Sequence, residues 1–346
     1  MDDYFGKRYK KYMIVPIVLL IPMLILILIF PGLTPGIDLT GGNVLIVRSS
    51  SPLSEQQIVS SLGQEFTLVD LKVSTIASPT GYGAYIQYSK DPIVSEAEAL
   101  LNLAELNLDN DIDSISYSNQ VIEKLGGSAQ EFSNSKLALL AAQDALAKHK
   151  EDFSVKLQNV LVEKLGLGSD VEFQKREISP TLGAASMQSA IFISIIGMIV
   201  IVVIIFLAFR QVVPSIAIIQ AMIFDVLAGL AGMALLGIPM SLTTIPALLM
   251  LVGYSVDTDI MLTSRMLKGK TGSPGEKATT SMKTGLTMTG TTLAALVAMI
   301  IVSYFYQIEV IYQIAAILLF GLIGDVISTW LMNAPILLWF VEKVRK

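Results

Sequence analysis

Six long apolar segments dominate this sequence and restrict the folds open to it. Each reaches about 20 residues, the length that an α-helix needs to cross the hydrocarbon core of a bilayer. The chain is 53% hydrophobic and only 15% charged, which is typical of an integral membrane protein rather than a soluble enzyme. The segments are 13–30, 187–209, 212–236, 242–262, 284–304 and 310–340. We therefore predict a membrane α-helical bundle in which one transmembrane helix precedes a long polar region and five follow it.

The polar region, residues 31–186, contains no segment that could span a membrane and is predicted to form one α+β domain. Expected strands cover 43–48, 67–76, 83–88 and 170–178, and expected helices cover 54–62, 95–108, 135–150 and 154–165. The order strand, helix, two strands, helix, strand is typical of a ferredoxin-like fold. An insertion near 90–134 interrupts this order, and its segment 109–119 is interpreted as a loop or a short strand.

Charge is distributed unevenly and predicts the orientation. Residues 31–186 hold 11 basic and 20 acidic residues, whereas the rest of the chain holds 13 basic and 9 acidic ones. Basic residues gather in loops on the cytoplasmic side of membranes. This rule puts the termini (1–12 and 341–346) and the loop 265–283 in the cytoplasm. The ferredoxin-like domain is then extracytoplasmic and the chain lies in the cell membrane. An acidic domain repels phosphate, so we do not expect nucleic acid as a partner.

Metal and nucleophile chemistry have few candidate residues. The chain has no cysteine, which excludes a thiolate metal site and a cysteine nucleophile. The single histidine, His149, stands in the sequence Ala-Lys-His-Lys and is expected at an exposed helix tip. We therefore expect neither a metal site nor an enzyme of the Ser-His-Asp type.

Four aspartates lie inside apolar segments: Asp225, Asp257, Asp259 and Asp325. A carboxylate at bilayer depth costs on the order of 3 kcal/mol, so acids at such positions usually line an ion path or make a buried polar contact. One interpretation is that the four change their charge during ion-coupled transport. The other is that they bond to serine and threonine hydroxyls and hold helices together.

Two of these acids are only two residues apart, which separates them by about 200° around a regular helix. Asp257 and Asp259 then cannot face the same partner. Either one faces the bundle interior and the other a second subunit or the membrane interface, or the helix is broken near Gly253 and Ser255.

Four ordered motifs resemble those of the SecD/SecF protein-export family within the RND superfamily. Gly36-Ile-Asp-Leu-Thr-Gly-Gly42 is similar to its Gly-hydrophobic-Asp-x-x-Gly-Gly signature. The sequence Ile-Ser-Pro-Thr-Leu-Gly at 178–183 is similar to its Val-Gly-Pro-x-Val-Gly element. Residues 253–259 and the later Arg265 resemble the SecF-side motif Gly-Tyr-Ser-Ile-Asn-Asp-Thr with its trailing Asp-Arg. Residues 283–292 resemble the threonine-rich start of the family's fifth helix.

The chain also departs from the family pattern. When the two motifs are aligned without a gap, the acidic position of the family's Asn-Asp-Thr corresponds to Thr258, which lies between Asp257 and Asp259. The family has an Asp before the final Arg, whereas this chain has Ser264 before Arg265. The resemblance therefore does not say which acid carries the ion. It does mark Gly253, Tyr254, Ser255, Thr258 and Arg265 as supporting residues. The insertion and the acid at 325 are typical of the archaeal branch.

The resemblance implies an RND-type fold and a role as an export accessory rather than an enzyme. Its implied partners are SecD with a second six-helix half, a SecY-type translocon, the exported unfolded polypeptide and the lipid bilayer. The resemblance implies no cofactor, and a proton or sodium gradient would supply the energy. Gly36, Gly41 and Gly42 would form a hinge, or simply a tight turn into the first strand. Two alternatives are an RND-type exporter of lipids or small molecules and an intramembrane aspartyl protease that uses Asp225 and Asp325.

Overall fold

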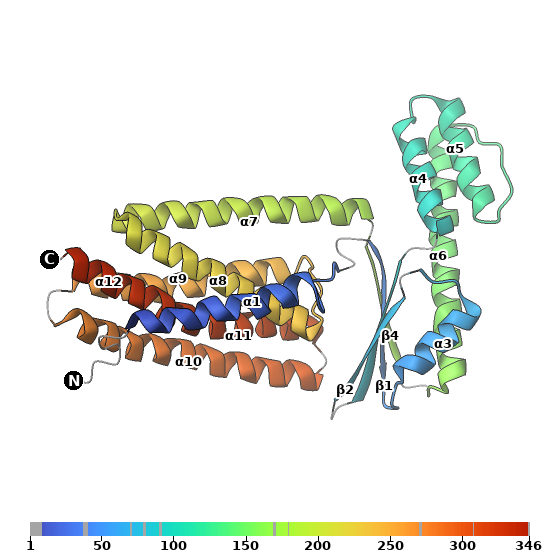
Figure 1. The fold of residues 1–346 in the computed structure, drawn as a ribbon. Coiled ribbons are helices and arrows are strands. Elements are labelled where there is room, and N and C mark those ends of the chain that lie inside the picture. The colour runs from blue at the N-terminus through green and yellow to red at the C-terminus, as the bar shows by residue number, and fades with distance from the viewer. Residues whose placement is uncertain are drawn as a thin grey trace. The chain divides into compact units, whose positions relative to one another are not determined.

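The chain folds into two compact units, which we call the helical unit and the α+β unit (Figure 1). The computed structural model describes residues 9–36, 41–69, 71–78, 81–89, 92–168, 171–178, 180–269, 272–306 and 308–344. The helical unit contains the described residues up to Gly36 and from Pro180 onward, and the α+β unit contains those between Gly41 and Ile178.

The helical unit confirms the predicted membrane bundle. Among the described residues, six helical stretches are long and apolar enough to cross a bilayer, one before the α+β unit and five after it. The elements are η1 (Tyr9–Met13), α1 (Ile14–Leu28), α7 (Pro180–Phe209), α8 (Val212–Leu236), α9 (Thr244–Lys268), α10 (Pro274–Tyr306), α11 (Glu309–Ser328), η2 (Thr329–Asn333) and α12 (Ala334–Val344). The last apolar segment is thus divided: α11 passes through η2, a π-helical turn, into α12.

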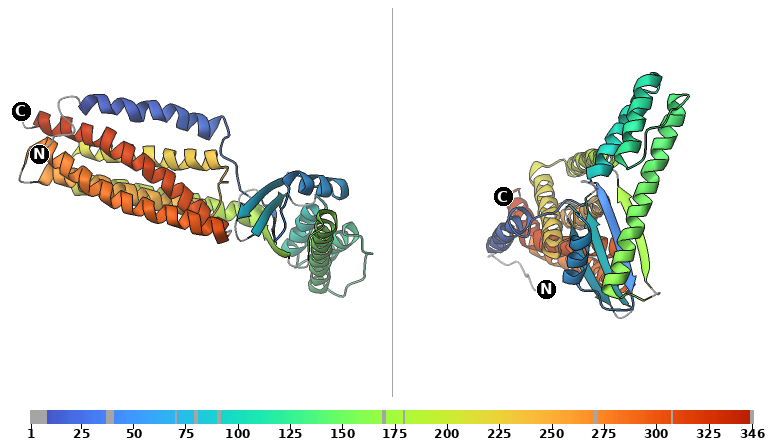
Figure 2. Two further views of the ribbon diagram at one scale, coloured as in Figure 1. Left: turned by 90° about the horizontal axis from the view of Figure 1, so that it is seen from below. Right: turned by 90° about the vertical axis from the view of Figure 1, so that its right-hand side faces the viewer.

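Helices α8 and α11 form the centre of the helical unit, and small residues let them approach closely. A Cβ built on Gly324 of α11 would lie 2.5 Å from the Cβ of Ala228 on α8. Such close approach is common between membrane helices, because dispersion contacts and hydrogen bonds replace the hydrophobic effect there. By contrast, α1 and α7 are mostly exposed. The left view of Figure 2 shows the helices of the bundle side by side.

The α+β unit has the predicted ferredoxin-like order. Its elements are β1 (Gly42–Ser49), α3 (Glu55–Glu65), β2 (Lys72–Ser78), β3 (Gly81–Tyr88), α4 (Pro92–Leu106), α5 (Asp111–Lys124), α6 (Ser135–Leu165) and β4 (Glu172–Ile178). The four strands form an antiparallel sheet in the order β2-β3-β1-β4. Helices α3 and α6 cover one face of it (Figure 1), and Ile58, Leu62, Leu157 and Leu161 pack there against Ile86.

The insertion forms a helical arm, defined here as α4, α5 and the first half of α6 (residues 92–150). The prediction of a loop or strand at 109–119 is wrong, because residues 111–119 belong to α5. The buried face of α5 includes Ser114 and Ser118 as well as apolar residues, so its helical pattern is weak in the sequence. The two predicted helices that follow are one continuous α6. His149 therefore lies partly buried in mid-helix and not at an exposed tip.

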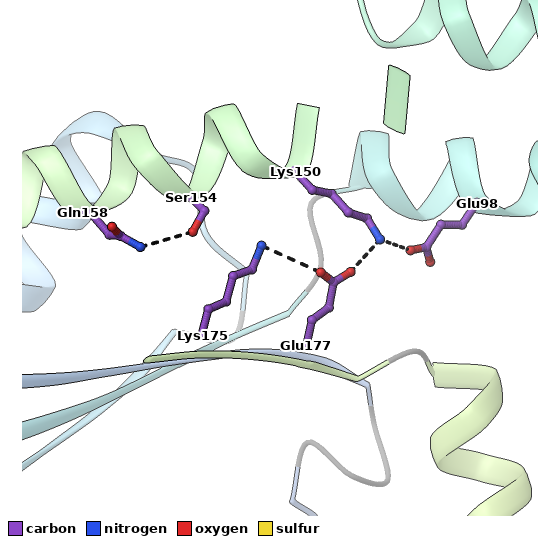
Figure 3. A network of polar contacts seen from close by, with 6 residues as sticks. All are labelled: Glu98, Lys150, Ser154, Gln158, Lys175 and Glu177. Carbon is purple, nitrogen blue, oxygen red and sulfur yellow. Dashed lines mark hydrogen bonds and ion pairs between the residues drawn. The ribbon is translucent and has the colours of Figure 1, made fainter. Parts of the chain in front are cut away.

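Lys150 of α6 joins the arm to the sheet through two carboxylates (Figure 3). Its Nζ donates to Glu98 of α4 at 2.7 Å and to Glu177 of β4 at 2.5 Å, and Glu177 also pairs with Lys175 at 3.7 Å. Partial burial lowers the pKa of Lys150, but the bonds to Glu177 and Glu98 outweigh it, so the pKa is raised overall. Burial and the charge of Glu177 raise the pKa of Tyr88 to about 12.

We expect Lys150→Met to lower the stability of the α+β unit at pH 8 by about 1–2 kcal/mol, because charged hydrogen bonds at a half-buried site are worth roughly that much. The pKa of Lys150 is higher in the folded than in the unfolded state. Its contribution is therefore complete below the unfolded pKa near 10.5 and is lost as the pH rises through the folded value. The raised pKa of Tyr88 has the same consequence, so its contribution to the stability of the α+β unit is also lost as the pH rises from 10 to about 12.

Pulse proteolysis of the full chain in urea with an alkaline protease would measure both effects, and the exposed Lys148→Met is the matched control. Lys150→Met should show a smaller loss of stability between pH 9.5 and 11 than the wild type. Equal midpoints for Lys150→Met and Lys148→Met would contradict the assignment.

Candidate functional site

Three aspartates from three helices meet inside the helical unit. Asp225 comes from α8, Asp259 from α9 and Asp325 from α11, and each is 0% exposed. They lie 34 and 66 residues apart in the sequence, so only the packing of α8, α9 and α11 brings them together. We call these residues, with the hydroxyl and amide groups that bond to them, the acid cluster.

Each carboxyl oxygen of Asp225 accepts a hydrogen bond from a serine of a neighbouring helix. Ser328 donates to Oδ1 at 2.6 Å, and Ser255 of α9 donates to Oδ2 in a short contact. Ser255, one of the predicted supporting residues, thus connects α9 to α8. A carboxylate that accepts from both hydroxyls is held firmly in one orientation.

Asp259 and Asp325 share one hydroxyl. The Oγ1 of Thr329 lies 2.9 Å from Asp259 Oδ1 and 3.0 Å from Asp325 Oδ1. A threonine hydroxyl has a single hydrogen, so both contacts are full hydrogen bonds only when one of the carboxyls is protonated and donates to Thr329. The geometry therefore suits an acid pair that holds a proton between its members.

The π-helical turn η2 supplies the polar groups opposite Asp259. Thr329 and Asn333 are its first and last residues, and the Asn333 amide donates to Asp259 Oδ1 at 2.6 Å. Such turns are rare and often occur at functional sites, because they displace the backbone from its regular hydrogen bonds. Three buried oxygens of this region make no hydrogen bond: Asp259 Oδ2, Asp325 Oδ2 and Asn333 Oδ1.

Among the described residues, no basic side chain pairs with the acid cluster. In the described part of the chain, none of its three carboxyls belongs to an ion pair, and the ion pairs that do form lie in the α+β unit. Arg265, which follows Asp259 by six residues on α9, donates instead to the Thr284 hydroxyl at 2.9 Å. Three unpaired carboxylates at zero exposure cost far more than the fold can supply. Neutral forms, with bound protons or another cation, are therefore required.

Asp257 does not join the acid cluster. Helix α9 is continuous, so the break considered near Gly253 is absent, and the two acids face opposite sides as a regular helix requires. Asp257 is exposed on the same face as Gly253 and Tyr254, the latter 45% exposed. Thr258 is buried, and its hydroxyl lies 3.5 Å from the carbonyl oxygen of Tyr254.

The glycines of the first motif occupy positions that a side chain would obstruct. A Cβ on Gly36 would lie 2.9 Å from the carbonyl oxygen of Met240, to which the Gly36 amide donates. Gly41 and Gly42 have φ of +71° and +134°, and a Cβ on Gly42 would lie 2.8 Å from the Tyr88 oxygen. Whether this segment acts as a hinge or only as a tight turn stays a prediction, because residues 37–40 lie outside the described residues.

Sequence reasoning missed one polar member of the site. Asn333 is completely buried and bonds to Asp259, although 74 residues separate the two. Its only sequence signal is an amide within an apolar segment, four residues after Thr329. Ser328 and Thr329 carry a clearer signal, because they share a helical face with Asp325.

Comparisons with known proteins agree with this architecture. Residues 161–343 match the family "Protein export membrane protein SecD/SecF, C-terminal", and residues 26–52 match the SecD/SecF GG motif. The protein-export membrane protein SecF of Methanocaldococcus jannaschii is 30% identical over 341 residues, which are 98% of each chain. SecF of Methanothermobacter thermautotrophicus is 29% identical over 343 residues, covering 98% of this chain and 95% of that protein.

A solved structure shows the same fold. The crystal structure of SecDF from Thermus thermophilus, a translocon-associated membrane protein, aligns with a TM-score of 0.58 at 13% identity. The alignment covers 97% of this chain but only 59% of that one, so the present chain spans little more than half of SecDF. With the family match over half its length and relatives aligned from end to end, this chain belongs to the SecD/SecF family of protein-export membrane proteins.

Proposed function

We propose that this chain is the SecF-type half of a SecDF accessory complex, which uses an ion gradient to assist export of unfolded polypeptides across the cell membrane. The acid cluster carries the proposal, because three buried carboxyls with no basic partner among the described residues must bind protons or another cation. The RND-type exporter of lipids or small molecules is not favoured, since the full-length relatives are export subunits. No enzymatic step and no cofactor are proposed.

The contacts of the acid cluster suggest how ion binding moves helices. When the pair Asp259–Asp325 holds a proton, Thr329 can bond to both carboxyls and keep α9 and α11 together. Loss of that proton leaves two carboxylates beside one hydroxyl, and their repulsion favours separation of the helices or entry of water. One charge that crosses 100 mV supplies about 2.3 kcal/mol, enough to shift a two-state equilibrium strongly.

The exposed face of α9 supports the proposal of a SecD partner. Asp257, Tyr254 and Gly253 share this face, and a Cβ on Gly253 would meet no atom within 4 Å. On α10, Thr287 and Gly290 are exposed as well. A carboxylate and small polar residues are unfavourable against lipid, whereas they are common where helix bundles meet. We assign this surface to the second six-helix half, SecD. SecY-type translocons and exported polypeptides are the further proposed partners.

The proposed orientation follows the basic loops. Both termini lie in the cytoplasm together with Arg210 and the loop 265–283, and the α+β unit lies outside. In this orientation the α+β unit is positioned to contact a polypeptide as it emerges.

A cross-linking experiment tests the assignment of the partner surface. Because the chain has no cysteine, Tyr254→Cys introduces a single thiol to which a benzophenone maleimide can be attached. In membranes that contain both subunits, illumination should give an adduct of this chain with SecD. Phe192→Cys on α7 is the matched control, since Phe192 is 64% exposed but lies on another helix. Labelling of SecD that is equal from both positions, or absent from Tyr254→Cys, would refute the assignment.

A further inference from the structure

The helical arm of the α+β unit ends in an exposed apolar tip. Leu106 is the last residue of α4 and is 75% exposed, and Ile112 is the second residue of α5 and is 81% exposed. These are the two largest exposed fractions among the large apolar side chains described in the α+β unit. The arm tip, as we use the term, consists of Leu103, Leu106, Ile112, Leu137 and Leu140, which are all at least 41% exposed.

Hydrogen bonds fix the backbone that displays the arm tip. The Ser135 hydroxyl donates to the Leu108 oxygen at 2.9 Å, and the Ser135 amide donates to Asp111 Oδ1 at 2.8 Å. The Ser114 hydroxyl donates to the Ala104 oxygen, also at 2.9 Å. These bonds bring the start of α6 to the α4–α5 turn, so all five apolar residues lie within about two helical turns of that turn. The surface is therefore ordered before anything binds.

The apolar residues of the tip are not needed for the core of the arm. That core is formed by Val94, Ala97, Val121, Ala142 and Leu146, all of them buried. Single exposed apolar side chains are ordinary, but several at the end of one projection often mark a binding surface. Figure 1 shows α4 and α5 beside the end of α6 that is remote from the sheet.

The charge of the arm narrows the choice of partner. Residues 92–150 contain 9 acidic and 4 basic residues, and Glu105, Asp109 and Asp113 are exposed near the tip. Hydrogen bonds from Ser135 lower the pKa of Asp111, so this carboxyl stays charged. An apolar surface with an acidic rim is complementary to a ligand that combines apolar and basic side chains. An unfolded polypeptide exposes both kinds, whereas a folded protein buries most of its apolar residues.

We propose that the arm tip binds unfolded polypeptide, at segments in which apolar residues alternate with lysine or arginine. This inference rests on the proposed export function, since the α+β unit would face the emerging chain. The apolar contacts supply most of the affinity, and the acidic rim selects basic segments and accelerates their encounter. Binding at such a small site is weak and reversible, as a polypeptide in transit requires.

The test uses the full chain in lipid nanodiscs and a fluorescein-labelled, unstructured peptide of leucine, lysine, glycine and serine. Fluorescence anisotropy should show binding that weakens as salt increases, because the rim charges are exposed. Leu106→Ser combined with Ile112→Ser should raise the Kd about tenfold or more. Val59→Ser on α3 is the matched control, because Val59 is also exposed, at 41%, but lies outside the arm. A peptide with glutamate in place of lysine should bind more weakly.

Two results would overturn the proposal. One is a Kd that the double variant leaves unchanged or that Val59→Ser raises equally. The other is loss of co-purified SecD from the double variant with peptide binding intact, which would make the tip a subunit contact. Both readouts are independent of the acid cluster. Asp259→Asn should bind the peptide like the wild type, so failure here does not count against ion-coupled export.

Discussion

Asp259→Asn is expected to abolish the stimulation of export by the ion gradient while the chain remains folded and inserted. The substituted amide would keep the shape of the side chain, and its carbonyl oxygen could still accept from Thr329 and Asn333, the two donors that contact Asp259 Oδ1. The amide cannot bind and release a proton at physiological pH and carries no charge for another cation. Export should fall to the rate that the wild type shows when the gradient is collapsed.

Asp257→Asn is the matched control, because the two acids are two residues apart on one helix but only Asp259 is buried with Asp325. Pulse-labelling in living cells would follow the release of a secreted protein, with a protonophore or a sodium ionophore added in parallel. The ionophore that reduces wild-type export to the level of Asp259→Asn identifies the coupling ion. If the ion gradient still stimulates export fully in Asp259→Asn, the acid cluster does not couple the gradient to export. If only Asp257→Asn reduces the stimulation, the coupling site lies on the exposed face of α9.

The sequence predicted the six helices, the ferredoxin-like order and the presence of acids inside the apolar segments, because each depends on local patterns. Segment length determines the helices, and the alternation of strands and helices determines the order. It could not predict which of Asp257 and Asp259 is buried. A helix with lipid or a partner on its outer face is apolar all round, so hydrophobic periodicity does not reveal the inward side. The two side chains that donate to Asp259 come from η2, and a π-helical turn has no sequence signature at this point.

The arm shows a second reason why sequence reasoning failed. Ser114 and Ser118 occupy the buried face of α5, so the polar sequence at 109–119 held no sign of a helix that packs. Ser114 is tolerated there because its hydroxyl bonds to a carbonyl oxygen of α4. Such a partner becomes known only when the two helices are placed side by side.

Gly324→Leu is expected to cause a large loss of stability of the helical unit. A Cβ at this position would already lie 2.5 Å from the Cβ of Ala228 and 3.7 Å from Asp225 Oδ1. The Ala228 methyl group is fixed to the backbone of α8 and cannot rotate away, so leucine must force α8 and α11 apart. Overpacking typically costs about 1–3 kcal/mol, and a larger loss is expected where the backbone has to move. Thermal aggregation of the detergent-solubilised chain, followed by size exclusion, would measure it.

Gly197→Leu on α7 is the appropriate control, because a Cβ at Gly197 meets no atom within 4 Å. It should melt like the wild type, and Gly324→Ala should fall between the two leucine variants. If Gly324→Leu and Gly197→Leu melt together, α8 and α11 are not in close contact at this level. Asp225 on α8 and Asp325 on α11 would then lie further apart than this structure places them. The same substitution therefore tests the geometry on which the proposed ion coupling depends, because Gly324 directly precedes Asp325 and holds α11 against the helix that carries Asp225.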